Sequence, residues 1–330
     1  MSTTADGPRK RAARGGGHGA LWRLYHGLLR YSSVLIGVAA ISLAAFLLFR
    51  LFQNYSIDDI VRSIGSARPG HLAAALGFAG ASYLSLTGFD YLALRYAGTP
   101  LNWRRAALAS FCGLSIGHNV GLAALSSGAV RYRFYSSWGL QAADVAKVIA
   151  FCGLTVGLGM GVLGGIVLVL RPSQANEMTG LGTSTTMAAG AAILAVIAGY
   201  LVLCGLRRRP FRFFKWTFSV PSLPLAIAQL AVGATNFALV GACLHQAIAG
   251  FEDVSYFSAA SAFVIANTTA LIAHVPGGLG IIETVVLKLL PASQMLAAVL
   301  LFRLVYFLVP LPLGIAALAI WEGWRRHKSR

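Results

Sequence analysis

Six apolar runs, each long enough to cross a lipid bilayer, decide what this chain can fold into. About 20 consecutive apolar residues suffice for one helical crossing. Hydrophobic residues make up 57% of the chain and charged residues only 11%, whereas a soluble globular chain carries about 25% charged residues. The composition therefore predicts an all-α integral membrane protein with about six full transmembrane helices. The runs cover approximately residues 32–52, 71–95, 145–170, 187–206, 223–249 and 295–321.

Two further apolar segments, residues 103–143 and 255–293, are interrupted by small residues and proline. The first is broken at Ser126-Ser127-Gly128 and the second at Pro276-Gly277-Gly278. The breaks are matched, because Gly128 and Gly280 are 152 residues apart, as are Arg131 and Glu283. Paired interruptions in corresponding halves of a membrane protein are typical of transporters built from inverted repeats, whose binding sites lie near the bilayer midplane.

The basic residues give these segments an orientation. The net charge of +17 is concentrated in the N-terminal tail, around residues 95–105, at 207–215 and at 325–330. Basic clusters beside apolar runs mark the cytoplasmic side, so both termini are predicted to be cytoplasmic. Segment 103–143 then begins and ends inside, and segment 255–293 begins and ends outside. The sequence therefore predicts two opposed re-entrant hairpins.

The predicted domain organisation follows from these assignments. Residues 1–30 form a basic cytoplasmic tail, expected to be disordered. Residues 31–325 form a single transmembrane domain, with one repeat at about 31–171 and an inverted repeat at about 187–325. The basic clusters sit at the ends of apolar runs, so we expect no nucleic-acid partner.

No cofactor or metal is expected from the motifs. The sequence contains no phosphate-binding loop, dinucleotide fingerprint or H-E-x-x-H zinc motif. Ser126 and Ser127 lack the G-x-S-x-G context of a serine nucleophile. The cysteines lie inside apolar runs without short mutual spacing, so they are interpreted as packing residues; they are Cys112, Cys152, Cys204 and Cys243.

The second break offers a candidate anion site. Pro276-Gly277-Gly278-Leu279-Gly280 leads into a predicted short helix, and the N-terminus of a helix favours anionic groups such as phosphate. The alternative is a tight turn that holds no ligand. Ser127 and Gly128 are the corresponding candidates at the first break.

Four charged residues fall within the apolar part of the chain: Asp90, Arg131, Glu283 and Arg303. Such residues are costly in a membrane and need a partner or water. Arg131 and Glu283 are expected to face one another across the pseudo-two-fold axis. Glu283 has three candidate partners: Arg131, Arg303 or a cationic headgroup. The alternative to a substrate site is a structural ion pair that locks the hairpins together.

Three motifs resemble those of a known family. Pro276-Gly277-Gly278-Leu279-Gly280-Ile281-Ile282-Glu283 resembles the P-G-G-[LF]-G-x-x-E signature of the lysylphosphatidylglycerol synthase transmembrane-region family. The stretch from Ser127 to Arg133 looks like its S/G-G-x-x-R-x-R element, and Arg303 with Tyr306 and Phe307 fits its late-helix arginine. The resemblance covers about residues 30–325.

This resemblance implies lipid translocation. The family includes the flippase part of bifunctional aminoacyl-phosphatidylglycerol synthases, which are also called multiple peptide resistance factors. We therefore expect a phospholipid translocator of the bacterial inner membrane, with aminoacyl-phosphatidylglycerol among the candidate substrates. Arg131 would hold the phosphate, while Glu283 and Asp90 would neutralise a cationic headgroup or exchange partners with Arg303.

The expected partners are membrane phospholipids and, as a candidate, a separate lipid-synthesising enzyme. The chain ends at Arg330, soon after the last span, so aminoacyl transfer by this polypeptide is not expected. The main alternative is a membrane component of lysylphosphatidylglycerol synthesis, either the aminoacyltransferase or its accessory subunit. A scaffold that recruits lipid enzymes is a third.

Overall fold

The structure, a computed structural model, describes residues 65–328 except 121–122, 207–210, 214–215, 219 and 274. The predicted tail 1–30 and the predicted span 32–52 lie outside the described residues. The described chain is helical apart from two three-residue strands that pair antiparallel, with Phe211 opposite Phe218. The elements are α3 (Pro69–Tyr96), α4 (Trp103–Val120), α5 (Ala123–Ser137), α6 (Ala142–Leu170), α7 (Pro172–Thr179), α8 (Thr183–Leu206), β1 (Phe211–Phe213), β2 (Trp216–Phe218), α9 (Leu223–Ala249), α10 (Tyr256–Ala273), η1 (Pro276–Gly278), α11 (Ile281–Leu289), α12 (Met295–Arg303), the π turn η2 (Leu304–Leu308) and α13 (Pro310–Lys328).

Six helices of the described chain are long and apolar enough to cross a membrane. Five of them, α3, α6, α8, α9 and the continuous helix from α12 to α13, coincide with predicted spans to within a few residues. The sixth is α10, which lies in the segment predicted to be a broken hairpin. The sequence prediction of several long apolar helices is thus confirmed within the described part.

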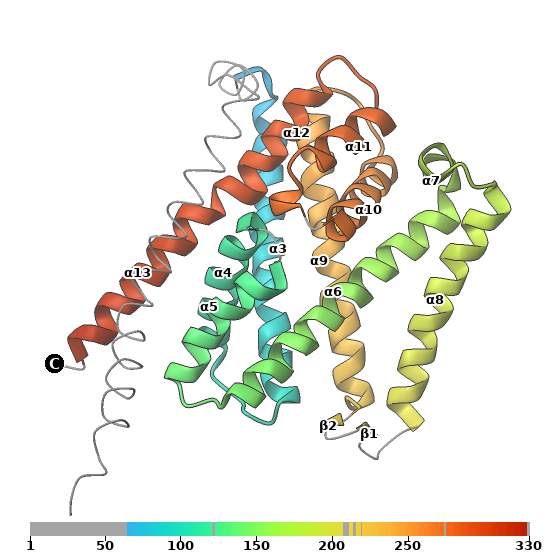
Figure 1. The fold of residues 1–330 in the computed structure, drawn as a ribbon. Helices are drawn as coiled ribbons and strands as arrows, with labels where there is room; N and C mark the ends of the chain where they lie inside the picture. The colour runs from blue at the N-terminus through green and yellow to red at the C-terminus, as the bar shows by residue number, and fades with distance from the viewer. Residues whose placement is uncertain are drawn as a thin grey trace, which may run out of the picture.

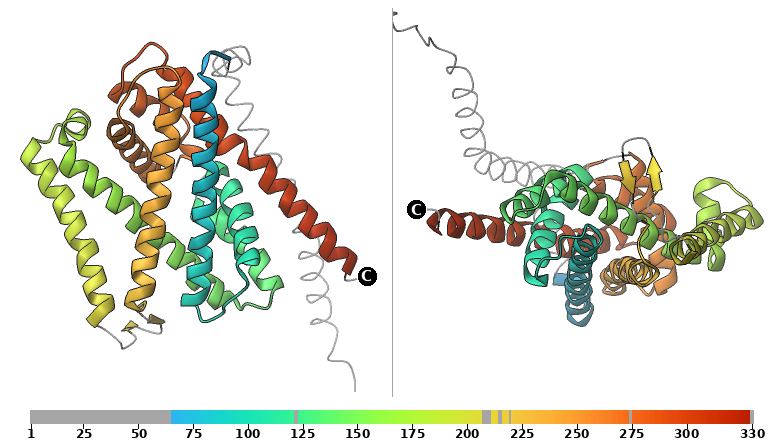
Figure 2. Two further views of the ribbon diagram at one scale, coloured as in Figure 1. Left: turned by 180° about the vertical axis from the view of Figure 1, so that it is seen from behind. Right: turned by 90° about the horizontal axis from the view of Figure 1, so that it is seen from below.

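The long helices α3 and α9 lie side by side in the middle of the molecule and run in opposite directions (Figures 1 and 2). Helix α6 passes diagonally in front of α9 in Figure 1 and packs against both α8 and α9. Helix α8 forms one flank of the molecule, and α13 extends along the opposite flank (Figure 1).

Glycines allow α6 and α9 to approach closely. A Cβ atom added to Gly159 would lie 2.4 Å from the carbonyl carbon of Gly233, and one added to Gly233 would lie 2.8 Å from the Thr155 carbonyl oxygen. Small residues that let backbones approach are a common basis of helix packing in membranes, where the hydrophobic effect does not draw helices together. The crossing of α6 and α9 therefore depends on this glycine pair.

The two broken segments occupy opposite halves of the molecule. Helices α4 and α5 pack together in the lower half of Figure 1, and α10, η1 and α11 pack together in the upper half. The glycine turn at Pro276-Gly277-Gly278 is where the sequence predicted a break. Its backbone needs glycine, because Gly277, Gly278 and Gly280 have φ angles of 59°, 58° and 80°, which other residues adopt only at a cost.

The first break is not where the sequence predicted it. Ser126-Ser127-Gly128 lies within α5, which begins at Ala123, and α4 ends at Val120. The small residues here serve packing instead of a turn: a Cβ added to Gly117 of α4 would lie 2.8 Å from the Cβ of Ser127. A serine–glycine stretch permits either use, and the sequence pattern did not separate the two.

Candidate functional site

A buried ion pair joins α5 to α3. Arg131 donates from Nε to Oδ1 of Asp90 at 2.7 Å and from Nη2 to Oδ2 at 2.8 Å. Its Nη1 donates to the hydroxyl of Ser127, one helical turn earlier, at 3.0 Å. Tyr135, one turn later, donates its hydroxyl to Oδ1 of Asp90 at 2.7 Å. This network satisfies a carboxylate with no exposed surface, as burial of a charge requires.

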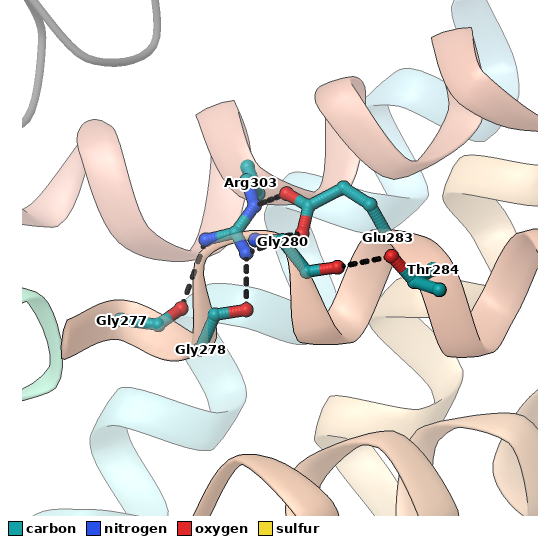
Figure 3. Close-up of polar contacts among 6 residues, drawn as sticks. All are labelled: Gly277, Gly278, Gly280, Glu283, Thr284 and Arg303. Atoms are coloured by element: carbon teal, nitrogen blue, oxygen red, sulfur yellow. Dashed lines mark hydrogen bonds and ion pairs between the residues drawn. The ribbon is translucent and has the colours of Figure 1, made fainter. Parts of the chain in front are cut away.

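A second buried ion pair holds the glycine turn (Figure 3). Arg303 of α12 donates from Nε and Nη2 to the two carboxylate oxygens of Glu283 on α11. It also donates to the carbonyl oxygens of Gly277 at 2.9 Å and Gly278 at 2.8 Å. The planar guanidinium therefore bridges a carboxylate and two turn carbonyls, which the point charge of a lysine would not do.

Glu283 also caps its own helix. Its Oε2 accepts a hydrogen bond from the backbone N–H of Gly280 at 2.8 Å, and the hydroxyl of Thr284 donates to the Gly280 carbonyl at 2.6 Å (Figure 3). A carboxylate in the first turn satisfies a free N–H group and interacts favourably with the helix dipole. Glu283 is thus already bound by its own chain at the point where an anion was expected to bind.

The four charged residues therefore form two separate pairs. Arg131 binds Asp90, and Glu283 binds Arg303, which was one of its three candidate partners. The expected pairing of Arg131 with Glu283 across the two halves does not occur in the structure. The physical reason is that each charge finds an opposite charge within its own half, so neither pair spans the two hairpins.

The end of α4 nevertheless meets the glycine turn. A Cβ added to Gly277 would lie 3.7 Å from the His118 carbonyl oxygen and 3.8 Å from that of Asn119. The Asn119 side chain also donates to the carbonyl oxygen of Phe307 at 3.1 Å. The C-terminal end of α4 therefore contacts both the glycine turn and the π turn.

Proline explains the free carbonyls of the π turn. Pro310 has no N–H to offer the preceding turn, and the Val309 N–H bonds to the Leu304 carbonyl at 2.8 Å, one residue further back than in an α-helix. The hydroxyl of Tyr83 donates to the Tyr306 carbonyl at 3.3 Å. Side chains from other helices thus donate hydrogen bonds to backbone carbonyls of the wide turn.

A cavity of about 420 Å³ lies between these networks. Arg131 and Ser127 border it from α5, Gly277 and Gly278 from the turn, and His118 from α4. The remainder of the wall is apolar except for two asparagines and a tyrosine. The other lining residues are Leu86, Phe89, Leu114, Ile149, Cys152, Gly153, Val156, Asn236, Phe237, Val240, Phe263, Asn267, Ala270, Leu271, Val275, Ile282, Tyr306 and Phe307.

The structure brings four of the nine predicted site residues to this cavity: Ser127, Arg131, Gly277 and Gly278. The other five are not among its described lining residues: Asp90, Gly128, Gly280, Glu283 and Arg303. Asp90 and Arg303 instead form hydrogen bonds with lining residues: Asp90 binds Arg131, and Arg303 binds the carbonyl oxygens of Gly277 and Gly278. Gly128 instead faces Ile149, since an added Cβ would lie 3.1 Å from that side chain.

Sequence reasoning missed three polar lining residues, namely Asn236, Asn267 and Tyr306. Asn236 accepts a hydrogen bond from Ser82 at 2.8 Å, and Ser82 lies 3.1 Å from the Tyr306 hydroxyl. A signal was present, because an asparagine within an apolar span is unusual and marks a functional position as a charge does.

Of the histidines in apolar segments, His118 lines the cavity and His245 does not. Nδ1 of His118 is buried without a hydrogen-bond partner among the described residues, and its ring stacks on Tyr306 with centroids 6.0 Å apart. His245 instead contacts the Val254 carbonyl oxygen at 2.9 Å, and His274 lies outside the described residues. In the described part of the chain, no three histidine, cysteine or acidic side chains are grouped to hold a metal ion.

Comparisons with known proteins identify a family of membrane proteins. The family described as "Lysylphosphatidylglycerol synthase TM region" matches residues 34–314. The uncharacterized protein slr0712 of Synechocystis is 32% identical over 84% of this chain and 88% of its own length. The inner membrane protein YbhN of Escherichia coli is 28% identical over 76% of this chain and 80% of its own. With its apolar helices and this match, the chain is a membrane protein that belongs to the lysylphosphatidylglycerol synthase transmembrane-region family.

Proposed function

We propose that this protein translocates phospholipids between the leaflets of a bacterial inner membrane, with the headgroup passing through the cavity beside Arg131. The observation that carries the proposal is a cavity that combines one guanidinium with an otherwise mostly apolar wall. Arginine is well suited to binding phosphate oxygens. Arg131 uses three of its five N–H groups on Asp90 and Ser127, which leaves two for a phosphate.

The cavity wall also suggests where the acyl chains remain. Gly153 of α6 and Leu271 of α10 line the cavity and are themselves exposed. We propose that the cavity opens to the bilayer between these two helices. A lipid could then insert its headgroup toward Arg131 while its chains stay among neighbouring lipids, so that little apolar surface is exposed to water.

We further propose that α4–α5 and α10–η1–α11 are opposed re-entrant hairpins of an inverted repeat. Their placement in opposite halves of the molecule and the contact of their tips support this arrangement (Figure 1). The half containing α4 and α5 would face the cytoplasm, because its end of the described chain is strongly basic. The basic residues at that end are Arg95, Arg104, Arg105, Lys147, Arg325 and Arg326.

The opposite end of the described chain carries as many acidic as basic residues, which supports an outward orientation of α10 and α11. Its charged residues are Arg68, Arg171, Glu177, Glu252, Asp253 and Lys288. A cysteine placed at exposed Gly323 should then react with an impermeant reagent only from the cytoplasmic side, and one at exposed Ser293 only from outside. Labelling with the sides exchanged would refute the orientation.

The translocation proposal is tested with the full chain reconstituted in liposomes. The measured quantity is the rate at which fluorescent phospholipids, labelled on an acyl chain, move from the inner to the outer leaflet and become accessible to dithionite. We expect a rate well above that of protein-free vesicles. Equal rates with and without protein across several lipid classes would refute the proposal.

Substitutions then connect transport to the cavity. Ser127→Ala and Asn267→Leu alter lining residues while leaving the Arg131–Asp90 pair in place, so they should slow transport in a folded protein. Arg133→Ala is a matched control. Arg133 lies on the same helix as Arg131, but it binds Glu322 and is not among the lining residues of the cavity.

The family description also suggests a role in lipid synthesis. Lipid analysis of a deletion strain distinguishes synthesis from translocation. A translocator changes the distribution of a lipid between leaflets while its total amount is retained. Loss of a lipid species from the membrane would indicate synthesis instead.

A further inference from the structure

We infer that the headgroups taken by this cavity contain a phosphate but no ammonium group. This inference rests on the proposed function and narrows its substrate class to lipids such as phosphatidylglycerol and phosphatidic acid. Phosphatidylethanolamine and lysylphosphatidylglycerol are excluded by it. The argument concerns which carboxylates remain available to a cationic headgroup.

Both carboxylate oxygens of Asp90 already accept hydrogen bonds. Oδ1 accepts from Nε of Arg131 and from the Tyr135 hydroxyl, each at 2.7 Å, and Oδ2 accepts from Nη2 of Arg131 at 2.8 Å. The side chain is fully buried. An ammonium group could reach Asp90 only by displacing Arg131, and the displaced guanidinium would then be buried without a partner.

Glu283 is occupied in the same way. Oε1 accepts from Nε of Arg303, and Oε2 accepts from Nη2 of Arg303 and the Gly280 N–H, both at 2.8 Å. Releasing this carboxylate would also free the guanidinium that holds the Gly277 and Gly278 carbonyls. Both carboxylates therefore already have partners within the chain.

No other described acidic residue takes their place. The structure describes seven of the ten acidic residues of the sequence, and none of the seven is among the lining residues of the cavity. The seven are Asp90, Asp144, Glu177, Glu252, Asp253, Glu283 and Glu322. The remaining three, Asp6, Asp58 and Asp59, precede the described residues.

The groups that do line the cavity suit a phosphate with hydroxyl substituents. Arg131 supplies cationic donors, and Asn236 and Asn267 supply neutral amides. Since Oδ1 of Asn236 accepts from Ser82, its NH₂ group is left as a donor. Because Arg131 lines the cavity and its partner Asp90 does not, an ammonium group here would lie closer to the guanidinium than to the carboxylate, and like charges repel.

The test compares lipids in one liposome assay with the unaltered protein. Acyl-labelled phosphatidylglycerol, phosphatidic acid, phosphatidylethanolamine and lysylphosphatidylglycerol are measured separately under identical conditions. We expect the first two to move at least tenfold faster than the last two. If both aminated lipids move as fast as phosphatidylglycerol, the inference is overturned while translocation stands. If no lipid is accelerated, both fall.

Two variants at one position test the physical cause. Asn267→Asp adds a carboxylate to the cavity wall and should raise the rate for lysylphosphatidylglycerol relative to phosphatidylglycerol at least fivefold. Asn267→Leu removes the same amide without adding charge and is the matched control, for which the ratio should not rise. An unchanged ratio in a folded Asn267→Asp variant would count against the inference.

Discussion

Arg131 on α5 binds both carboxylate oxygens of Asp90 on α3, although 41 residues separate them in the sequence. The pair fixes α5 against α3, one of the two central helices. It also holds Arg131 where this side chain lines the cavity. One interaction thus serves stability and the proposed function, and the two roles can be separated by substitution.

The stability role predicts strong coupling between the two residues. Asp90→Asn and Arg131→Gln should each destabilise the protein by about 3–5 kcal/mol, because each leaves one charge buried without its partner. The double variant should recover much of this loss, since two neutral amides can bond to each other. Thermal unfolding in detergent measures all three, and additive losses would contradict the coupling.

Arg303→Lys should destabilise the glycine turn and α11 in spite of the retained charge. A lysine cannot bind Glu283 and both turn carbonyls as the guanidinium does, so at least one charged hydrogen bond is lost, at about 1.5–3 kcal/mol. The midpoint of thermal unfolding should fall. Arg325→Lys is the control. Arg325 is exposed and its contact with Glu322 is long, at 3.6 Å, so this substitution should change the stability little.

Alanine at the glycine turn should be costly to different extents. Gly277→Ala should cost about 1–2 kcal/mol, because its φ of 59° is unfavourable for alanine although the added Cβ meets nothing closer than 3.7 Å. Gly278→Ala should cost more, since its Cβ would also lie 2.9 Å from Ile282. Gly199→Ala in α8, with open space around it, should be neutral or stabilising. Equal unfolding temperatures for all three variants would contradict this explanation.

The helix crossing gives a further prediction. Gly159→Ala places a methyl group 2.4 Å from the Gly233 backbone, so α6 and α9 must separate, at about 1–3 kcal/mol or more. Gly157→Ala, two residues earlier on α6, has no neighbour within 4 Å and is the matched control. In detergent, Gly159→Ala should unfold at a lower temperature than Gly157→Ala. An equally destabilised Gly157→Ala would argue against the helix crossing as the cause.

The parts of this fold that are predictable from sequence are those governed by local rules. Long apolar runs give the spans, and Pro276-Gly277-Gly278 gives the turn, because a backbone in the left-handed region needs glycine. Ser126-Ser127-Gly128 was assigned to a turn by the same reasoning and lies within α5 instead. Small residues that pack helices and small residues that bend the chain look alike until the partner helix is known.

The pairing of charges was only partly predictable. Arg303 was foreseen as a partner of Glu283, but the match of Arg131 with Asp90 depends on how α3 and α5 pack, which no local pattern gives. The two asparagines of the cavity wall were missed for the same reason. Asn236 and Asn267 lie on different helices, α9 and α10, and only the tertiary arrangement brings them to one surface.

The grip of Arg303 on the glycine turn has a mechanical consequence. Four hydrogen bonds from this one side chain tie α12 to the tip and to the start of α11, and α12 continues through the π turn into α13. The glycine turn, α11 and this long helix are therefore expected to move as one unit, so that tilting α13 would displace the glycine turn with it.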